Sequence, residues 1–295
     1  MQIELRLLEY FLVLADELHF TRAAERLGIS QPTLSSQIQL LEARLNTRLF
    51  ERTGRRVSLT QAGKLLLEHA RRVFYELEQA KAEIGDLQGL QRGSLSVGCA
   101  GGHLLLKAAA KFHARHPKVQ LSIFDMRSEE TIDLLLNHRL DLGVIFLSAE
   151  DPRLDSIHLF DEEFCLVVSA GHKLAGVPSA SLEDLTAIPL VLLPKHYLVR
   201  QFIDEYTAAH GVELFPIMEL STMEAIRFIL SIQTLAAIMT KSYVTQIQDP
   251  SLVVIPLIDV PHRAVRLVYP KHTYLDQIRT KFIQYVLEIY KPLTA

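Results

Sequence analysis

The sequence predicts a multidomain fold in which an all-α unit with a short hairpin, a long linker helix and a two-lobed α/β unit follow one another. The first 60 residues hold short stretches with apolar side chains at helical spacing, separated by turn residues. One long periodic stretch follows, to about residue 87. Beyond residue 93, strand-like apolar runs alternate with helix-like segments, which is typical of α/β folds.

The composition is that of a globular protein. Of the 295 residues, 49% are hydrophobic and 22% are charged. The apolar residues of the first helix-like stretch are interrupted by acids, unlike a signal peptide or a membrane span. These acids are Glu4, Glu9, Asp16 and Glu17. We therefore expect a cytoplasmic protein with no membrane partner.

The charge is unevenly distributed along the chain. A net charge of -3 excludes a uniformly basic coat for nucleic acid. Between Arg44 and Arg56, however, the chain has five arginines and a single acid, Glu51. Contact with nucleic acid would have to use this local patch.

A helix, a tight turn and a second helix are predicted between about residues 20 and 39. Thr21 is a candidate N-cap of the first of these helices. Gly28 ends it, because glycine readily adopts the left-handed conformation that terminates a helix. Ser30 then caps the next helix.

The helix after Ser30 has an apolar face and an uncharged polar face. Leu34 and Ile38 belong to an inward stripe that continues at intervals of three and four residues. Short polar side chains on the other face can approach base edges in the major groove at little desolvation cost. The candidate DNA contacts of this helix are Gln31, Pro32, Thr33, Ser35 and Ser36. The alternative is a solvated helix face.

A short hairpin, or wing, is predicted next. Val57 and Leu59 alternate with a polar residue, and Thr53 and Gly54 form a turn. The arginines at the tip would face phosphates or the adjacent minor groove. They are Arg52, Arg55 and Arg56. The alternative is that they only make a loop soluble.

The segment FTRAAERLGISQPTLSSQIQLLEARLNTRLFERTGRRVSLTQAG closely resembles the DNA-binding domain of LysR-type transcriptional regulators. The resemblance implies a winged helix-turn-helix at 1–60, a linker helix at 61–89 and an effector-binding domain at 90–295. It also implies that the five helix residues given above and Arg52 face DNA. The position of Ser36 usually holds arginine in this family, so we expect Arg55 or Arg56 to compensate.

The linker helix carries a pattern for pairing with a second copy. Thr60 is its candidate N-cap. Apolar residues then alternate at intervals of four and three: Leu66, Ala70, Val73, Leu77, Ala80, Ile84 and Leu87. We expect a homodimer that binds a pseudo-palindromic site on double-stranded DNA. The alternative to this pairing is a linker helix buried against its own chain. The family resemblance further implies that two such dimers form a tetramer.

The rest of the chain is predicted to form two α/β lobes with parallel sheets, like a periplasmic binding protein. The first lobe spans about 90–162 and 267–295, and the second spans about 163–266. The last helix, LDQIRTKFIQYVLEIY, is expected to return to the first lobe.

Ligands of such folds collect where strands end and helices begin. In the first lobe these positions are Ala100, Gly101, Gly102 and Ser128. In the second lobe, Ser221 and Glu224 form a candidate capping box, with Thr222 at the same helix start. Each of these turns alone is more often a plain helix cap, which is the alternative.

The segment LLPKHYLVRQFID also follows a strand, and its side chains could hold a small anion. These are Lys195, His196, Tyr197 and Arg200. A solvated surface is the equally weighted alternative. The family resemblance adds Phe146 and implies that it lines an inducer cleft together with the first-strand turn, the helix start at Ser128 and this segment. The segment is also similar to that of cyanate-responsive members.

Together these observations predict a transcriptional regulator whose DNA binding is modulated by a small anion or organic acid in an interlobe cleft. No motif favours an enzyme or a cofactor, and His113 and His116 lack a third metal ligand, so no metal site is predicted. One alternative is a redox sensor that uses Cys99, although Cys165 is poorly placed as its partner. Another is a two-lobed solute-binding protein or enzyme with a helical N-terminal arm.

Overall fold

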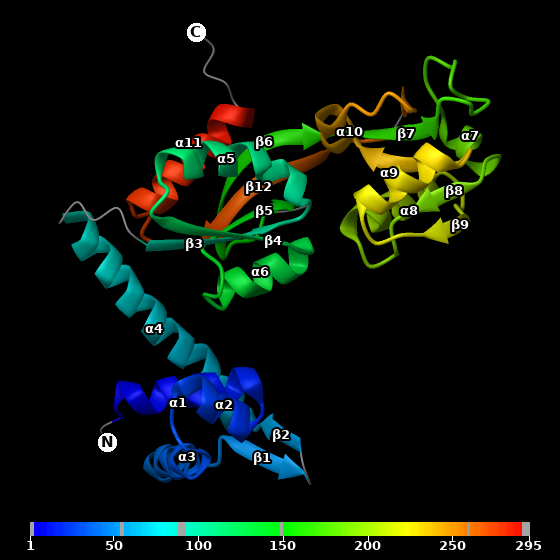
Figure 1. Ribbon diagram of the computed structural model, residues 1–295. Helices are drawn as coiled ribbons and strands as arrows, with labels where there is room; N and C mark the ends of the chain where they lie inside the picture. The colour runs from blue at the N-terminus through cyan, green and yellow to red at the C-terminus, as the bar shows by residue number, and fades with distance from the viewer. Residues whose placement is uncertain (1–2, 54–55, 88–92, 148–149, 259, 291–295) are drawn as a thin grey trace. The chain divides into compact units, whose positions relative to one another are not determined.

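The computed structural model describes residues 3–53, 56–87, 93–147, 150–258 and 260–290. The chain divides into two compact units, Met1–Gly89 and Leu90–Ala295 (Figure 1).

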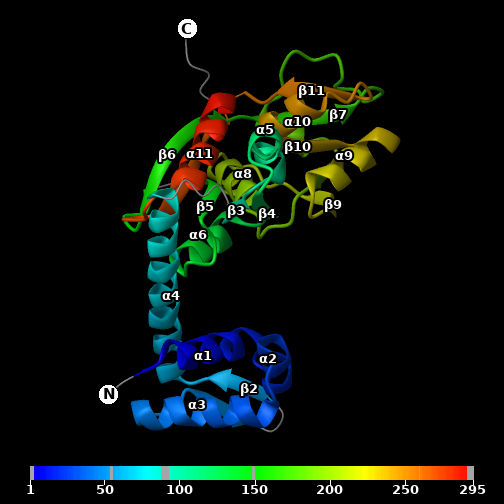
Figure 2. The same ribbon diagram turned by 60° about the vertical axis from the view of Figure 1, so that its left-hand side comes forward.

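The N-terminal unit is a three-helix core followed by a hairpin and a long helix. Its elements are α1 (Leu5–Glu17), α2 (Phe20–Leu27), α3 (Gln31–Leu45), β1 (Phe50–Thr53), β2 (Arg56–Leu59) and α4 (Gln61–Leu87). Phe11 and Leu14 of α1 are fully buried against Leu34 and Leu41 of α3. The predicted inward stripe of α3 is therefore confirmed. Figure 2 shows α4 leaving this core as a single straight helix.

Two of the three predicted helix signals around the turn are confirmed. Gly28 has a φ of 66°, and the Ser30 hydroxyl accepts the N–H of Thr33 at 3.3 Å. The prediction that Thr21 caps α2 is wrong. The helix begins one residue before Thr21, and the His19 imidazole accepts the N–H of Arg22 at 3.4 Å.

A set of hydrogen bonds joins the hairpin to α4. The Thr60 hydroxyl donates to the carbonyl of Arg48 at 2.7 Å and accepts the N–H of Gly63 at 3.0 Å, which confirms Thr60 as the cap. The chain passes very close to itself here, because a Cβ on Gly63 would lie 2.1 Å from the carbonyl oxygen of Leu49. Position 63 therefore requires glycine.

The apolar seam predicted on α4 is divided between two surroundings. Leu66 and Ala70 pack against the core of the N-terminal unit. Val73, Leu77 and Ile84 are 40%, 38% and 55% exposed. The start of the seam thus packs on its own chain, and the later part is left open among the described residues.

The first lobe of the C-terminal unit is built on a five-stranded sheet of order β4-β3-β5-β12-β6. Its strands are β3 (Gly93–Cys99), β4 (Val119–Asp125), β5 (Leu142–Phe146), β6 (Leu154–Glu162) and β12 (Arg263–Pro270). Its helices are η1 (Gly102–Leu105), α5 (Leu106–Arg115), α6 (Ser128–Leu136) and α11 (Gln277–Tyr290). Helices α5 and α11 pack on one face and α6 on the other (Figure 1).

The second lobe is built on a five-stranded sheet of order β11-β7-β10-β8-β9. Its strands are β7 (Phe164–Ser169), β8 (Leu190–Leu192), β9 (Pro216–Glu219), β10 (Ala236–Thr240) and β11 (Leu252–Pro256). Its helices are α7 (Leu182–Thr186), α8 (Leu198–Ala209), α9 (Met223–Ile232) and α10 (Lys241–Ile247). One apolar cluster contains residues of α7 and α8, and a second contains residues of α9 and α10.

The lobes differ from the predicted parallel sheets. Strand β12 runs antiparallel to β5 and β6, and β7 runs antiparallel to β10 and β11, so both sheets are mixed. Strand β6 was not predicted, because polar residues interrupt its apolar pattern. The chain rejoins the first sheet at Arg263, four residues before the predicted position.

The predicted return of the last helix is confirmed. The ring centroids of Phe112 in α5 and Phe282 in α11 are 5.3 Å apart. Among the described residues, none of the helices has the length and the apolar run that crossing a bilayer requires.

We predict that Gly63→Ala destabilises the N-terminal unit by about 1–3 kcal/mol, because the new methyl group meets backbone that cannot move aside. Gly85→Ala in the same helix is the matched control, since a Cβ there meets nothing within 4 Å. The control should be neutral or stabilise the unit by up to about 1 kcal/mol. Chemical denaturation followed by circular dichroism measures both, and equal stability of the two variants would contradict the close approach.

Candidate functional site

The polar face of α3 is open in the N-terminal unit. Gln31, Pro32, Thr33 and Ser36 are exposed, and Ser35 is half-buried. Short local bonds orient the hydroxyl groups, with the Ser36 hydroxyl donating to the carbonyl of Thr33 at 2.9 Å. This face therefore offers uncharged donors and acceptors at the start of a helix, and their contact with DNA stays a prediction.

The hairpin has the antiparallel register of a wing, with Arg52 opposite Val57. Arg55 lies outside the described residues, as do the side chains of Arg52 and Arg56. Within the same basic patch, Arg44 is ion-paired with Glu4 at 3.0 Å, whereas Arg48 is exposed.

A cavity of about 420 Å³ lies between the two lobes of the C-terminal unit. Eight of the ten predicted effector positions line it: Ala100, Gly101, Gly102, Ser128, Phe146, His196, Tyr197 and Thr222. The first five come from the first lobe and the last three from the second. The structure thus brings these positions together, although a ligand role for each stays a prediction.

Two glycines bring α6 close to the sheet on the first-lobe side. A Cβ on Gly98 or on Gly143 would lie 2.7 Å from the methyl group of Thr131 in α6. The close approach puts the buried hydroxyl of Ser128 3.2 Å from the N–H of Phe146, which donates to it. The start of α6 and the end of β5 are therefore held together at the wall of the cavity.

The second-lobe wall begins at α9, whose cap differs from the prediction. The Thr222 hydroxyl accepts the N–H of Ala225 at 3.1 Å, so Thr222 is the N-cap and the predicted capping box of Ser221 and Glu224 is wrong. The carbonyl of Ser221 instead accepts the hydroxyl of Tyr197 at 2.8 Å.

Lys195 and Arg200 do not line the cavity, contrary to prediction. Arg200 is 1% exposed inside the second lobe, where it donates to Asp204 at 2.7 Å and to Glu219 at 2.9 Å. Its guanidinium also donates to the carbonyl of Leu193 at 2.7 Å, so it lies behind the cavity wall and not in the lining. Lys195 is exposed. The two cations that motivated an anionic effector are thus placed elsewhere.

The sequence did not predict most of the ionisable residues of the cavity: His103, Asp125, Arg127 and Glu130. Glu224, which also lines the cavity, was predicted only as part of a helix cap. Acids in the first turn of a helix are usual because they interact favourably with its dipole, so Glu130 and Glu224 gave no separate sign of a ligand.

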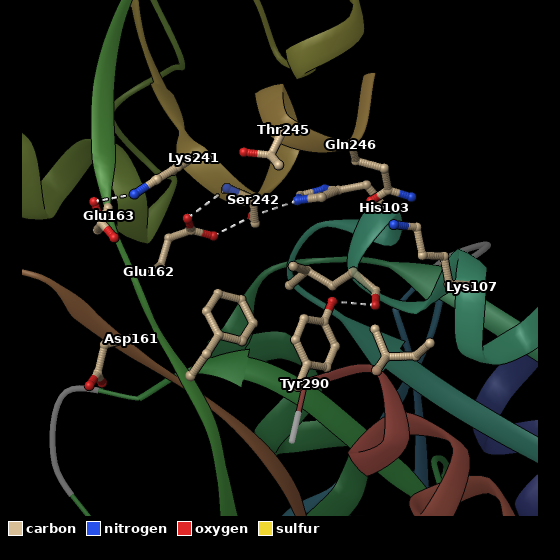
Figure 3. Close-up of a pocket in the computed structure, with 13 residues that line it drawn as sticks. His103, Lys107, Asp161, Glu162, Glu163, Lys241, Ser242, Thr245, Gln246 and Tyr290 are labelled. Carbon is tan, nitrogen blue, oxygen red and sulfur yellow. Dashed lines mark hydrogen bonds and ion pairs between the residues drawn. The ribbon is translucent and has the colours of Figure 1, made fainter. Parts of the chain in front are cut away.

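A second cavity of about 330 Å³ lies where the chain crosses between the lobes (Figure 3). Glu162, at the end of β6, is 1% exposed and accepts both the hydroxyl and the N–H of Ser242 in α10. The hydroxyl of Ser242 is also 3.0 Å from Nε2 of His103, which lines both cavities. The hydrogen bonds from Glu162 through Ser242 to His103 form the interlobe link.

Burial shifts both ionisable ends of the interlobe link toward neutral forms. It raises the pKa of Glu162, against the opposing effect of the hydrogen bonds from Ser242. It also lowers the pKa of His103, although the charges of Asp125 and Glu224 act in the opposite direction. His103 is therefore mainly neutral at pH 7.

The two thiols have the properties of buried, unreactive side chains. Burial raises the pKa of Cys99 well above its usual range, and the charge of Asp125 adds to this effect. Burial likewise raises the pKa of Cys165 to about 12. A redox sensor needs an accessible thiolate, so these surroundings do not favour the redox alternative. Within the described residues, no cluster of three His, Cys, Asp or Glu side chains could hold a metal ion.

A helix-turn-helix unit and a two-lobed unit with an interlobe cavity, both on one polypeptide, define the class of ligand-responsive bacterial transcriptional regulators. Comparison with known proteins identifies the family within that class. Residues 5–64 match the bacterial regulatory helix-turn-helix proteins of the LysR family, and residues 88–291 match the LysR substrate binding domain. The chain belongs to the LysR family of DNA-binding transcriptional regulators and carries an effector-binding domain.

Its relatives are regulators rather than enzymes. An uncharacterized HTH-type transcriptional regulator, YnfL of Escherichia coli (strain K12), is 34% identical over 78% of this chain and 78% of its own length. The regulator ShiR of Corynebacterium glutamicum (strain R) is 35% identical over 65% of this chain and 67% of its own length.

Full-length structures show the same fold. An OxyR variant from Pseudomonas aeruginosa has a TM-score of 0.75 and 25% identity, and the match covers 99% of this chain and 98% of that one. The regulator CbnR has a TM-score of 0.67 and 23% identity, and the match covers 98% and 100%. CbnR bound to its target DNA has a TM-score of 0.66 and 23% identity, over 96% and 99%.

We predict that neither thiol of the folded protein reacts readily with Ellman's reagent at pH 8, because burial excludes the reagent and suppresses the thiolate. Unfolding in guanidinium should make both react, and absorbance follows the reaction. Cys165→Ser isolates Cys99. Rapid reaction of Cys99 in that folded variant would reopen the redox alternative.

Proposed function

We propose that this chain binds a pseudo-palindromic DNA site through α3 and the β1–β2 wing, and that a small molecule in the interlobe cavity modulates this binding. The main support for the proposal is that eight of the predicted effector positions line one cavity. The same chain exposes the polar face of α3, the predicted DNA-recognition helix. A cytoplasmic location follows from a role on DNA. The domain bounds 1–60, 61–89 and 90–295 are part of the proposal.

The interlobe link suggests how a ligand acts. His103 contacts the interlobe cavity on one side and Ser242 on the other, and Ser242 holds the buried carboxylate of Glu162. A ligand that contacts His103 would bias the angle between the lobes. We propose that this bias changes the geometry of the dimer and thereby the spacing of its recognition helices, as a shift between existing states.

We propose that the exposed part of the α4 seam pairs with a second copy, and that two such dimers form a tetramer. Val73, Leu77 and Ile84 are large apolar side chains in contact with water, and burying them would favour association. Two copies of α3 would then face two half-sites, which supports a pseudo-palindromic operator.

The double variant Gln31→Ala, Arg52→Ala tests the DNA contacts. We expect at least about a tenfold loss of affinity for a fragment from upstream of the gene, because base contacts contribute about 1–3 kcal/mol each. The slope of affinity against salt should also fall by about one if Arg52 contacts a phosphate. Fluorescence anisotropy across a salt series measures both quantities.

The matched control is Arg139→Ala, Gln201→Ala, because both side chains are exposed in the C-terminal unit. This control should bind DNA like the wild type. Absence of selective binding by the wild type at every salt concentration would contradict the proposed function, as would equal losses in the two double variants.

Leu77→Glu, Ile84→Glu tests the association surface. A charge at each exposed seam position should shift the protein toward monomers, because burying an unpaired carboxylate is costly. Light scattering coupled to gel filtration measures the mass. Arg72→Glu on another side of α4 is the control and should leave the mass unchanged. An unaltered oligomer in the seam variant would show that α4 does not pair through this face.

A further inference from the structure

The charge of the interlobe cavity is opposite to that expected for an anionic effector. Among the described residues that line it, three side chains are carboxylates and one is a guanidinium. The carboxylates are Asp125, Glu130 and Glu224, and the guanidinium is Arg127. By side-chain charge alone, an anion entering this cavity would meet an excess of like charge, whereas a cation would be attracted.

Two of the carboxylates line the cavity from opposite lobes. Asp125 ends β4 in the first lobe, and Glu224 lies in the first turn of α9 in the second. The charges of both act on His103, which also lines the cavity. Because His103 is mainly neutral at pH 7, it does not compensate these two charges.

A buried hydroxyl gives a second, independent sign of a ligand. Thr240, at the end of β10, lines the cavity and is 2% exposed. Its Oγ1 has no hydrogen-bond partner among the described residues. A buried hydroxyl without a partner is unfavourable, so a polar atom of a ligand within its reach would be stabilised.

The first-lobe wall supplies the remaining polar groups. One carboxylate oxygen of Asp125 accepts the N–H of Gly102 at 3.1 Å. This hydrogen bond holds the carboxylate beside the turn that follows β3. Arg127 and Glu130 flank the start of α6. A ligand with a cationic end and an anionic end would thus find partners for both, with the carboxylates in excess.

We propose that the interlobe cavity binds a small molecule with a protonated nitrogen, an ammonium or guanidinium group, held between Asp125 of the first lobe and Glu224 of the second. The inference rests on the proposed function of the cavity and specifies its ligand class. In the absence of a ligand, the two carboxylates repel each other across the cavity. A cation between them converts this repulsion into attraction and favours approach of the lobes.

Three probes of equal chain length test the ligand class on the full-length protein. Putrescine is a diamine, γ-aminobutyrate is a zwitterion and succinate is a dianion, and all three have the same four-carbon chain. Isothermal titration at low salt and millimolar probe concentrations should show that putrescine, γ-aminobutyrate or both bind more tightly than succinate. A preference for γ-aminobutyrate would indicate an amino acid, and a preference for putrescine would indicate an amine without a carboxylate.

Glu224→Gln should reduce the affinity for the bound amine about tenfold, because it removes one charge-assisted interaction. Glu130→Gln should reduce it as well. Glu129→Gln is the matched control, since Glu129 is the neighbouring exposed acid of α6 and does not line the cavity. The control should bind the probe like the wild type.

Tighter binding of succinate, strengthened by Glu224→Gln, would overturn the cationic class while leaving the cavity as the ligand site. Failure of all three probes to bind would also overturn it. Neither result changes the outcome expected for the DNA-binding experiment. Failure of the proposed ligand class can therefore be distinguished from failure of the proposed regulator function.

Discussion

The geometry of the ligand-binding unit depends on one buried carboxylate. Glu162 lies at the point where the chain leaves the first sheet for the second, and its oxygens are bound by Ser242 of the second lobe. Burying a carboxylate is costly unless hydrogen bonds satisfy it, so the two lobes are constrained to keep this contact. Because Ser242 also contacts His103, the same constraint reaches the wall of the interlobe cavity.

Each lobe has its own sheet and its own apolar clusters, so the lobes can move as bodies while their interiors stay packed. In the proposed ligand site, repulsion between Asp125 and Glu224 would favour separation of the lobes, and the interlobe link would limit it. A cationic ligand would change this balance from within the cavity. Sensing would then be an electrostatic event that is transmitted by the interlobe link, without a role for the buried thiols of Cys99 and Cys165.

Local signals in the sequence predicted the N-terminal unit well, because capping and amphipathic spacing act over a few residues. Gly28, Ser30 and Thr60 each formed the predicted turn or cap. The His19 cap was missed because imidazole is an unusual cap, and β6 was missed because its pattern is mostly polar. The alternation of strands and helices predicted which strand ends line the cavity. It did not predict the charge of the side chains that line the cavity. Arg200 turned inward to Asp204 and Glu219, and that pairing of distant side chains depends on tertiary packing.

The interlobe link is tested most directly by hydrogen exchange of the full-length protein and of Ser242→Ala, followed by mass spectrometry. Removing this hydroxyl breaks the hydrogen bonds that connect Glu162, at the end of β6, with His103, which lies in η1 at the wall of the interlobe cavity. We expect faster exchange in both α10 and η1, because each element loses a partner in the other lobe. Faster exchange confined to α10, with η1 unchanged, would contradict a link that joins Ser242 to the wall of the interlobe cavity.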